Sequence, residues 1–285
     1  MNNLLSHKGE EPEKSVLYIV GTPIGNLKDI SPRALNILQN VSLIACEDTR
    51  RTKKLINNFE IKNNLISFHK YNSSAKIPNI IEYLNDGKSV ALVSDAGMPS
   101  ICDPGEELVN QVKLKKFEVV CIPGPCAALT ALITSGMSSS RFIFEGFLPR
   151  NKVDRKKILA DICKNEKTTI LYESPHRLKR LLLELKEHCG GKREIQISKE
   201  LTKKFEQNIS DKIDNVIEFF CNKEIKGEFT IVIKGIKNEN SFNLDKSVIK
   251  EELKLLINAG LSLSAASKYL AKKTNLSKSV IYKLY

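Results

Sequence analysis

Two short loops rich in glycine and proline, each following an apolar run, are the most informative part of this chain. The first covers residues 93–100 (VSDAGMPS) and the second residues 122–128 (IPGPCAA). Glycine and alanine leave room for a flat ligand to approach backbone amides, and proline stiffens the turn. In an open α/β sheet, small ligands bind where the strands end. We therefore expect these loops to form a pocket for a ligand of nucleoside size.

The sequence lacks the motifs of several common enzyme classes. Gly21 and Gly25 are too closely spaced for a P-loop, and no Gly-Lys-Ser/Thr follows them. The sequence contains no Gly-x-Gly-x-x-Gly fingerprint, no Gly-x-Ser-x-Gly elbow and no His-x-x-x-His pair. Nicotinamide, hydrolase and zinc chemistry are therefore disfavoured. A pocket of small residues with acids and bases nearby favours a group transfer that depends on positioning.

Two pairs of cationic residues stand at helix starts beside strand ends. Asp48 can cap the helix that follows it, and Arg50 and Arg51 occupy the first turn of that helix. Cations on a helix usually form a solvated face, but the helix dipole disfavours them in the first turn, so the placement indicates an anionic ligand. His176 and Arg177 are expected to point outward at the start of another helix.

The charge of the chain is unevenly distributed. The 285 residues carry a net charge of +12, and residues 246–285 contain eight Lys against two Glu, a net charge of +6. Such a local excess indicates a polyanionic partner such as nucleic acid. The alternative is a general richness in lysine that has no bearing on partners.

The cysteines and the amino terminus bear on location. Seven cysteines, an odd number, favour a reducing compartment. The amino terminus has no signal sequence and no apolar stretch approaches a membrane span, so we expect a cytoplasmic protein. Cys121 and Cys126 flank the Pro-Gly-Pro turn and are interpreted as small core residues. We interpret Asp103-Pro104-Gly105 as a helix start with proline at its first position.

Strand and helix patterns alternate along residues 15–136, after an expected flexible tail at residues 1–14. Strands are expected at residues 16–20, 43–46, 65–68, 90–93 and 119–122. Helices are expected at residues 32–39, 49–57, 77–85, 105–115 and 127–135. Because parallel strands need crossover helices, this alternation predicts a parallel sheet whose trailing loops meet at one edge.

Residues 137–240 mix strands and helices less regularly, which predicts a second α/β domain with antiparallel pairs. Its strands are expected at residues 142–147, 169–172, 194–198 and 229–233, and its helices at residues 152–163, 175–188 and 211–220. A polar linker, residues 237–245, leads into a basic helical unit over residues 241–285. The spacing of helices and turns in that unit is typical of a helix-turn-helix, with helices expected at residues 248–258, 263–272 and 277–284.

Long motifs in series carry a family resemblance. Residues 17–27 (LYIVGTPIGNL) with residues 45–52 (ACEDTRRT) resemble the tetrapyrrole-methylase superfamily, and within it the branch of bacterial 16S rRNA (cytidine-2′-O)-methyltransferases. Four later stretches match that branch in order: residues 94–105, 122–131, 172–178 and 198–206. The resemblance implies two α/β domains with a cofactor cleft between them, S-adenosyl-L-methionine as methyl donor and a homodimer. It also implies 16S rRNA or the small ribosomal subunit as partner, with the cytidine conventionally numbered 1402 as the target.

The resemblance also implies which residues surround the donor. By analogy these are Pro23, Ile24, Gly25, Asp95, Ala96, Gly97, Ser100, Ile101, Pro123, Gly124, Ala127, Leu171 and Tyr172. The sequence departs from the branch at Met98, where threonine is usual, and at Cys102, where serine is usual. Residues 70–72 (KYN) replace a Glu-His-Asn run, so no catalytic base is assigned to the loop after His69.

The hypothesis from the sequence is therefore a 2′-O-methyltransferase acting on rRNA. The expected polar residues near the reaction are Asp95, Asp103, Lys199 and Glu200, and no metal is expected. The residues expected to bind RNA are Arg50, Arg51, His176, Arg177, Lys272 and Lys273. Two alternatives stay open: a methyltransferase of the same fold acting on a tetrapyrrole or a protein side chain, and a non-catalytic RNA-binding protein.

Overall fold

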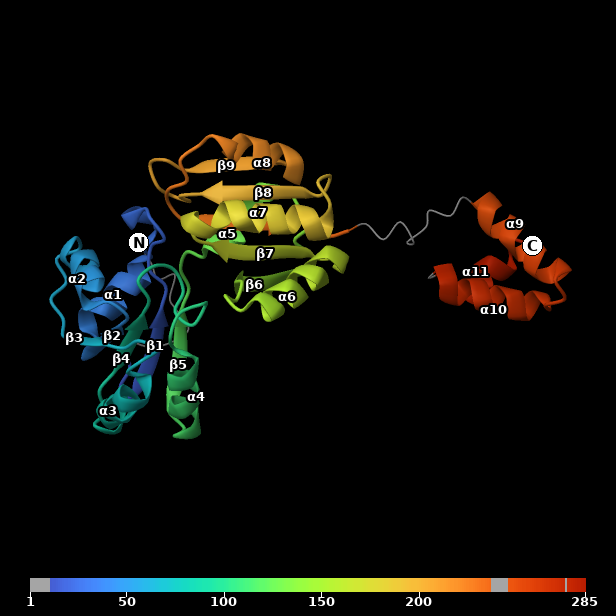
Figure 1. The fold of residues 1–285 in the computed structure, drawn as a ribbon. Coiled ribbons are helices and arrows are strands. Elements are labelled where there is room, and N and C mark those ends of the chain that lie inside the picture. Colours follow the sequence, from blue (N-terminus) through green and yellow to red (C-terminus); the bar gives the residue numbers. More distant parts are fainter. Residues whose placement is uncertain (1–10, 237–245, 275) are drawn as a thin grey trace, which may run out of the picture. The chain divides into compact units, whose positions relative to one another are not determined.

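Five apolar runs in the first half of the chain form one parallel sheet (Figure 1). They are β1 (Val16–Val20), β2 (Leu43–Cys46), β3 (Leu65–Ser67), β4 (Val90–Val93) and β5 (Glu118–Ile122). The strand order is β3-β2-β4-β1-β5, and every neighbouring pair is parallel. β1, β2 and β4 are buried at every residue, as a parallel sheet covered on both faces requires. The parallel sheet expected from the sequence is confirmed.

The covering helices place a crevice at the centre of this sheet. Helices α1 (Pro32–Asn40) and α2 (Thr49–Asn57) pack on one face, and α3 (Ser73–Asn85) and α4 (Glu106–Leu114) pack on the other. The chain therefore leaves the neighbouring strands β1 and β4 toward opposite faces. Loops that separate in this way open a binding crevice at the carboxyl ends of the strands. One turn of 3-10 helix, η1 (Leu27–Asp29), follows the loop after β1.

A second, mixed sheet follows in the sequence. Its strands are β6 (Phe142–Phe147), β7 (Thr168–Glu173), β8 (Glu194–Lys199), β9 (Gln207–Lys212) and β10 (Phe229–Ile233). In the order β6-β7-β10-β8-β9, only β6 and β7 are parallel. The antiparallel pairs are confirmed, but β9 was not expected, and the helix placed at residues 211–220 starts later, as α8 (Ile213–Cys221). β9 is a mostly exposed edge strand with polar residues, so it lacks the apolar alternation that reveals a strand.

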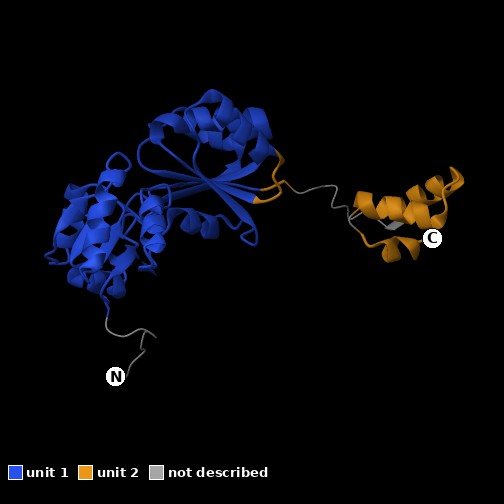
Figure 2. Ribbon diagram, turned by 90° about the horizontal axis from the view of Figure 1, so that it is seen from below, with its two compact units in different colours: residues 1–163, 168–234 blue, residues 164–167, 235–285 orange. Residues whose placement is uncertain are grey.

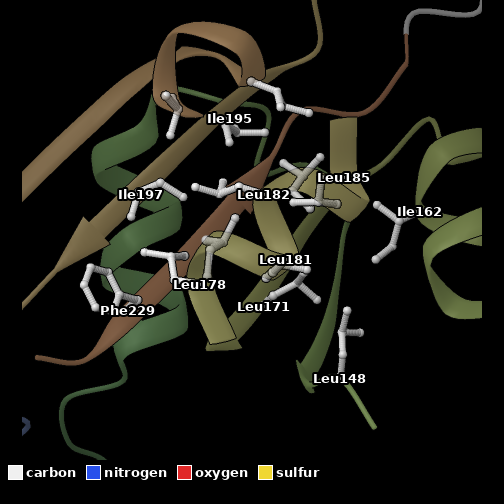
Figure 3. Close-up of a cluster of buried hydrophobic side chains, with 14 of the residues drawn as sticks. Leu148, Ile162, Leu171, Leu178, Leu181, Leu182, Leu185, Ile195, Ile197 and Phe229 are labelled. Atoms are coloured by element: carbon white, nitrogen blue, oxygen red, sulfur yellow. The ribbon is translucent and has the colours of Figure 1, made fainter. Parts of the chain in front are cut away.

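Helices cover both faces of the second sheet. On one face, α5 (Ala127–Ser135) packs through Ala131 and Leu132 against β7 and β10. On the other face, α6 (Lys152–Lys164), α7 (Pro175–Cys189) and α8 share a leucine-rich core (Figure 3). Helix α7 contributes Leu178, Leu181 and Leu185, whose spacing places them on one stripe of the helix.

The structure, a computed structural model, describes residues 11–236, 246–274 and 276–285. Most of the expected flexible tail and the whole expected linker lie outside the described residues. The chain divides into two units, residues 1–163 with 168–234 and residues 164–167 with 235–285 (Figure 2). The second contains α9 (Lys246–Asn258), α10 (Leu263–Thr274) and α11 (Lys278–Tyr282) around an apolar core of its own. Within the described ranges, no helix has the length and apolar character needed to cross a membrane.

Candidate functional site

The loop after β1 is joined to the loop after β4 by a pair of backbone hydrogen bonds. The N–H of Thr22 donates to the carbonyl of Gly97 at 2.9 Å, and the N–H of Gly97 donates to the carbonyl of Thr22 at 3.1 Å. Gly97 has a φ of +81°, a backbone conformation that glycine adopts without steric cost. The glycine in the first informative loop is thus explained by the turn that it makes.

The loop after β5 joins the same rim through a second glycine pair. A Cβ atom placed on Gly21 would lie 2.7 Å from the Cα of Gly124, so the two backbones touch where no side chain fits. The N–H of Gly21 also donates to the carbonyl of Ile122 at 3.1 Å. Three loops that are far apart in the sequence are therefore held together, and the expected convergence at one sheet edge is confirmed.

A cavity of about 350 Å³ opens beside these loops. Its lining from the first half of the chain consists of Ile24, Arg51, Asp95, Ala96, Gly97, Met98, Ile101, Cys102, Asp103, Cys126 and Ala127. Its lining from the second sheet and its loops consists of Phe147, Tyr172, Glu173, Ser174, Pro175, Ser198, Leu201, Gly227, Glu228, Phe229 and Thr230. Both sheets belong to the same structural unit, so the cavity is a cleft between two α/β halves.

One wall of the cavity is aromatic. The hydroxyl of Tyr172 accepts a hydrogen bond of 3.1 Å from the N–H of Ala128, in the first turn of α5. Its ring packs against Phe144 at a centroid distance of 5.0 Å and against Phe147 at 5.6 Å. Burial raises the pKa of the Tyr172 phenol well above its ordinary value. Tyr172 is thus a fixed, neutral surface against which a planar ring can pack.

The lining of the cavity also includes acidic side chains. Asp95 accepts a hydrogen bond from the N–H of Asp48 at 3.1 Å, and its second oxygen lies 3.4 Å from Nη1 of Arg51. Burial, and after it the nearby carboxylate of Glu47, raise the pKa of Asp103 to about 6. Burial also raises the pKa of Glu47. The cavity therefore offers one carboxylate held by a hydrogen bond and an ion pair, and one that titrates close to neutral pH.

The structure brings about half of the expected donor-binding residues to the cavity. Those that line it are Ile24, Asp95, Ala96, Gly97, Ile101, Ala127 and Tyr172. Those that do not are Pro23, Gly25, Ser100, Pro123, Gly124 and Leu171. Leu171 is fully buried in the core because neighbouring residues of a strand face opposite sides of the sheet. Gly124 lies against the backbone of Gly21, and Gly25 packs against Lys203 and Thr202.

Of the expected catalytic residues, Asp95 and Asp103 line the cavity, whereas Lys199 and Glu200 do not. Glu200 instead pairs with Lys203 at 3.0 Å and accepts a hydrogen bond from the N–H of Glu228 at 2.9 Å. Glu228 lines the cavity, so this hydrogen bond holds in place a segment of the cavity wall. Glu200 therefore positions that segment and does not line the cavity itself.

The expected RNA-binding residues fall into different environments. Arg50 pairs with Asp48 at 2.8 Å, and its guanidinium holds the pKa of Asp48 well below the ordinary value. Arg51 reaches the cavity wall, and His176 is exposed. The outward orientation expected for Arg177 is wrong, because its Nη2 donates to the carbonyl of Leu148 at 2.6 Å.

The two tail lysines expected to bind RNA lie at the end of α10. Lys272 and Lys273 occupy its last turn, and Lys273 pairs with Glu252 of α9. That turn is the carboxyl end of the helix dipole, which favours cations without any ligand. Their role in RNA binding stays a prediction.

Two further interpretations of the sequence need correction. Pro104 is not the first residue of a helix, because α4 starts at Glu106 with Gly105 as its N-cap. The shift leaves Asp103 free to line the cavity. Cys121 is not a core residue, since it is exposed on the edge strand β5. Elsewhere at the rim, Ser174 is the N-cap of α7, and its side chain makes no capping hydrogen bond.

The second sheet contributes the lining residues that sequence reasoning missed. Ser198 on β8 and Thr230 on β10 are paired in register, and both line the cavity. The polar residue inside the otherwise apolar run of β10 was the available signal for this pair. Across the described part of the chain, no group of three or more His, Cys, Asp or Glu side chains is arranged to hold a metal ion.

Comparisons with known proteins agree with the family resemblance seen in the motifs. The sequence profile described as “Tetrapyrrole (Corrin/Porphyrin) Methylases” matches residues 16–217. A Synechocystis sp. protein named ribosomal RNA small subunit methyltransferase I is 42% identical over 269 residues, which cover 94% of this chain and 96% of that protein. A Bacillus subtilis protein of the same name is 43% identical over 277 residues, 96% of this chain and 94% of that protein. These matches confirm the resemblance inferred from the motifs.

A solved structure supports the fold class. It is that of uroporphyrin-III C-methyl transferase from Thermus thermophilus complexed with S-adenyl homocysteine. Its TM-score is 0.56 at 13% sequence identity, and the match covers 76% of this chain and 96% of that chain. The expected fold class, two α/β halves with additional carboxyl-terminal helices, is confirmed.

Proposed function

The chain belongs to the tetrapyrrole methylase family, and from this premise we propose that it transfers a methyl group from S-adenosyl-L-methionine to a ribose 2′-hydroxyl of 16S rRNA. One observation carries the proposal: two relatives named for small-subunit rRNA methylation are 42% and 43% identical over more than nine-tenths of the chain. We take the acceptor within that rRNA to be the cytidine conventionally numbered 1402, as the motif resemblance implies.

The cavity fits the proposed donor. Its volume of about 350 Å³ lies within the range of small-molecule sites. The Tyr172 ring offers a face for the adenine, the backbone around Gly97 leaves room for close approach, and Asp95 offers a carboxylate to the positive charge of the donor. When bound, S-adenosyl-L-methionine supplies an electrophilic methyl group on a sulfonium.

The residues of this chain have two tasks in such a reaction. The loops joined by Thr22 and Gly97 hold the donor in one orientation relative to the incoming ribose, which converts a bimolecular encounter into a positioned one. As the oxygen–carbon bond forms, the methyl–sulfur bond breaks and S-adenosylhomocysteine leaves, and a carboxylate must accept the proton of the 2′-hydroxyl. We assign this role to Asp103, because it lines the cavity and its pKa of about 6 suits a general base at neutral pH.

The charge of the chain supports an RNA substrate. The net charge is +12, and residues 246–285 account for half of that excess. Contacts between cations and phosphates make RNA affinity fall steeply as the salt concentration rises. A methyltransferase of a tetrapyrrole or of a protein side chain makes no comparable use of this charge.

The decisive experiment maps methylated riboses in small-subunit rRNA by mass spectrometry, in a strain that lacks the gene and in the same strain complemented with it. We expect one 2′-O-methyl cytidine, at position 1402, to disappear and return. Complementation with Asp103→Asn is expected to fail, and complementation with Asp161→Asn, which changes an exposed carboxylate on α6, to succeed. An unchanged map in the deletion strain contradicts the proposal.

A second measurement separates the remaining alternatives. Calorimetry with S-adenosyl-L-methionine alone distinguishes an enzyme from a non-catalytic RNA-binding protein, which takes up no donor. An rRNA substrate also implies a cytoplasmic location. We propose a homodimer as the assembly, with the exposed apolar side chains Leu129 and Ile133 of α5 as candidate contacts. Light scattering of the wild type and of Ile133→Glu tests this.

A further inference from the structure

A second hollow, of about 410 Å³, lies next to the donor cavity and is strongly basic. Its charged and polar lining consists of Arg150, Arg155, Ser174, His176, Arg177 and Arg180. Ser174 lines both hollows, and Glu173, which lines the donor cavity, pairs with two of these arginines. The two hollows are therefore immediate neighbours.

Two carboxylates only partly compensate the four guanidinium groups. Glu184 accepts hydrogen bonds from Nε of Arg155 at 2.7 Å and from Nε of Arg180 at 2.8 Å. Glu173 lies 3.2 Å from Nε of Arg177 and 3.6 Å from Nη2 of Arg155. Within the described part of the chain, no carboxylate lies within ion-pair distance of Arg150. The hollow thus keeps an excess of positive charge.

Arg155 is the most telling member of this group. It lies on the buried stripe of α6 with Leu159 and Ile162, and its side chain is only 3% exposed. Both of its terminal nitrogens, Nη1 and Nη2, are buried without a hydrogen-bond partner among the described residues. Unpaired donors on a buried guanidinium are unfavourable, because the charged group has lost its hydration and gained no hydrogen bond in return. An anionic oxygen in the hollow would satisfy them.

The amino end of α7 also favours an anion in the hollow. Pro175 has no N–H, the Ser174 side chain makes no capping hydrogen bond, and no acidic residue occupies the first turn. Within the first turn of this 15-residue helix, no carboxylate offsets the partial positive charge of its amino end. The nearest acid, Glu173, precedes the N-cap and accepts a hydrogen bond from the N–H of Ser174 at 2.9 Å. Helix amino ends with free N–H groups bind phosphate and similar anions.

We propose that this hollow binds a backbone phosphate of the substrate RNA that flanks the methylated ribose, so that it sets the register of the RNA relative to the donor cavity. The inference rests on the proposed function for the identity of the RNA. Arginine forks match phosphate oxygens in pairs, and contacts of this kind fix position without reading the bases. Glu173 couples the two hollows, because it contacts Arg155 and Arg177 on one side and lines the donor cavity on the other.

The first test measures RNA binding without methyl transfer. Binding of an unmodified small-subunit rRNA fragment is followed by fluorescence anisotropy in the presence of S-adenosylhomocysteine. Arg150→Gln and Arg180→Gln, which change exposed side chains, are each expected to raise the dissociation constant about tenfold. Each is also expected to reduce the slope of log affinity against log salt by about 0.7. Arg141→Gln removes an exposed arginine outside the hollow and is the matched control.

The second test locates the phosphate. RNA fragments carry a single neutral methylphosphonate at one of the phosphates that flank the target ribose. At the bound phosphate, wild-type affinity is expected to fall about tenfold, and Arg150→Gln is expected to lose no further affinity there. The proposed phosphate site is contradicted if Arg150→Gln and Arg180→Gln bind RNA like Arg141→Gln. It is also contradicted if no single methylphosphonate removes the difference in affinity between the wild type and Arg150→Gln. Either result leaves the proposed methyl transfer intact. An unchanged methylation map instead overturns the proposed function and leaves the RNA-binding measurement interpretable.

Discussion

The hydroxyl of Tyr172 accepts a hydrogen bond from the backbone N–H of Ala128 at 3.1 Å. Tyr172 belongs to β7 of the second sheet, and Ala128 lies in the first turn of α5, directly after the glycine-rich loop that follows β5. Because helix α5 starts with Cys126 as N-cap and without a side-chain cap, the phenol oxygen serves as the acceptor for one of its free N–H groups. One bond thus connects the donor loops of the first sheet to the aromatic wall of the second.

Tyr172→Phe is expected to lower both stability and donor affinity. The N–H of Ala128 loses its acceptor, which destabilises the fold by about 1 kcal/mol. Urea unfolding and calorimetry with the donor measure the two effects. Tyr71→Phe, at a side chain that is 93% exposed, is the matched control and should change neither quantity. If the two variants have the same unfolding free energy and the same donor affinity, the hydrogen bond from Ala128 to Tyr172 does not stabilise the site.

Gly21→Ala tests the contact between the loops after β1 and β5. A Cβ at this position would lie 2.7 Å from the Cα of Gly124, and backbone atoms cannot move aside cheaply. We expect a loss of about 1–3 kcal/mol in unfolding free energy and weaker donor binding. Gly136→Ala is the comparison: nothing lies within 4 Å of its Cβ, so it meets only the strain of its φ of +64°. Unchanged donor affinity in Gly21→Ala contradicts the loop arrangement.

Asp103 makes stability and activity depend on pH in opposite directions. Burial raises its pKa from 3.8 to about 6, so folding favours the protonated acid. Its stabilising contribution is complete below pH 3.8 and is lost as the pH rises through about 6. Wild-type stability should therefore fall over this window relative to Asp103→Asn, as unfolding at several pH values measures.

The same titration should govern the rate. If Asp103 accepts the hydroxyl proton, only its ionised form is active, so kcat/KM should rise through about pH 6 and then level off. Asp103→Asn should remove most of the activity while donor binding persists. Asp161→Asn controls for loss of a carboxylate. A wild-type rate that is flat between pH 5 and pH 7 assigns the base elsewhere.

Asp95→Asn should alter the preference between donor and product. The donor carries a sulfonium and the demethylated product a neutral thioether, so a nearby carboxylate stabilises only the former. Asparagine retains an oxygen to accept the hydrogen bond from Asp48, and the loop should keep its position. For a partly exposed carboxylate the effect is at most about 1 kcal/mol, or about fivefold in the ratio of the two dissociation constants. Calorimetry with both ligands measures it, and an unchanged ratio excludes this role.

The sequence by itself determined the type and order of the elements in the first half of the chain. β1, β2 and β4 are short runs of apolar residues that are buried on both faces, and the helices between them can only be crossovers of a parallel sheet. That topology brings the trailing loops to one edge whatever their detailed packing. The concentration of lysine in the tail was likewise evident from the sequence, because net charge needs no structure.

Tertiary structure alone decided which side chains reach the site. Tyr172 faces the cavity and Leu171 the core, a difference of one position on β7 that depends on how the second sheet faces the first. Arg155 stands in a charged stretch that the sequence presents as a solvated helix face, yet it is buried because α6 packs it against Glu173 and Glu184. Burial and pairing are properties of contacts between distant segments, and no local pattern of residue types encodes them.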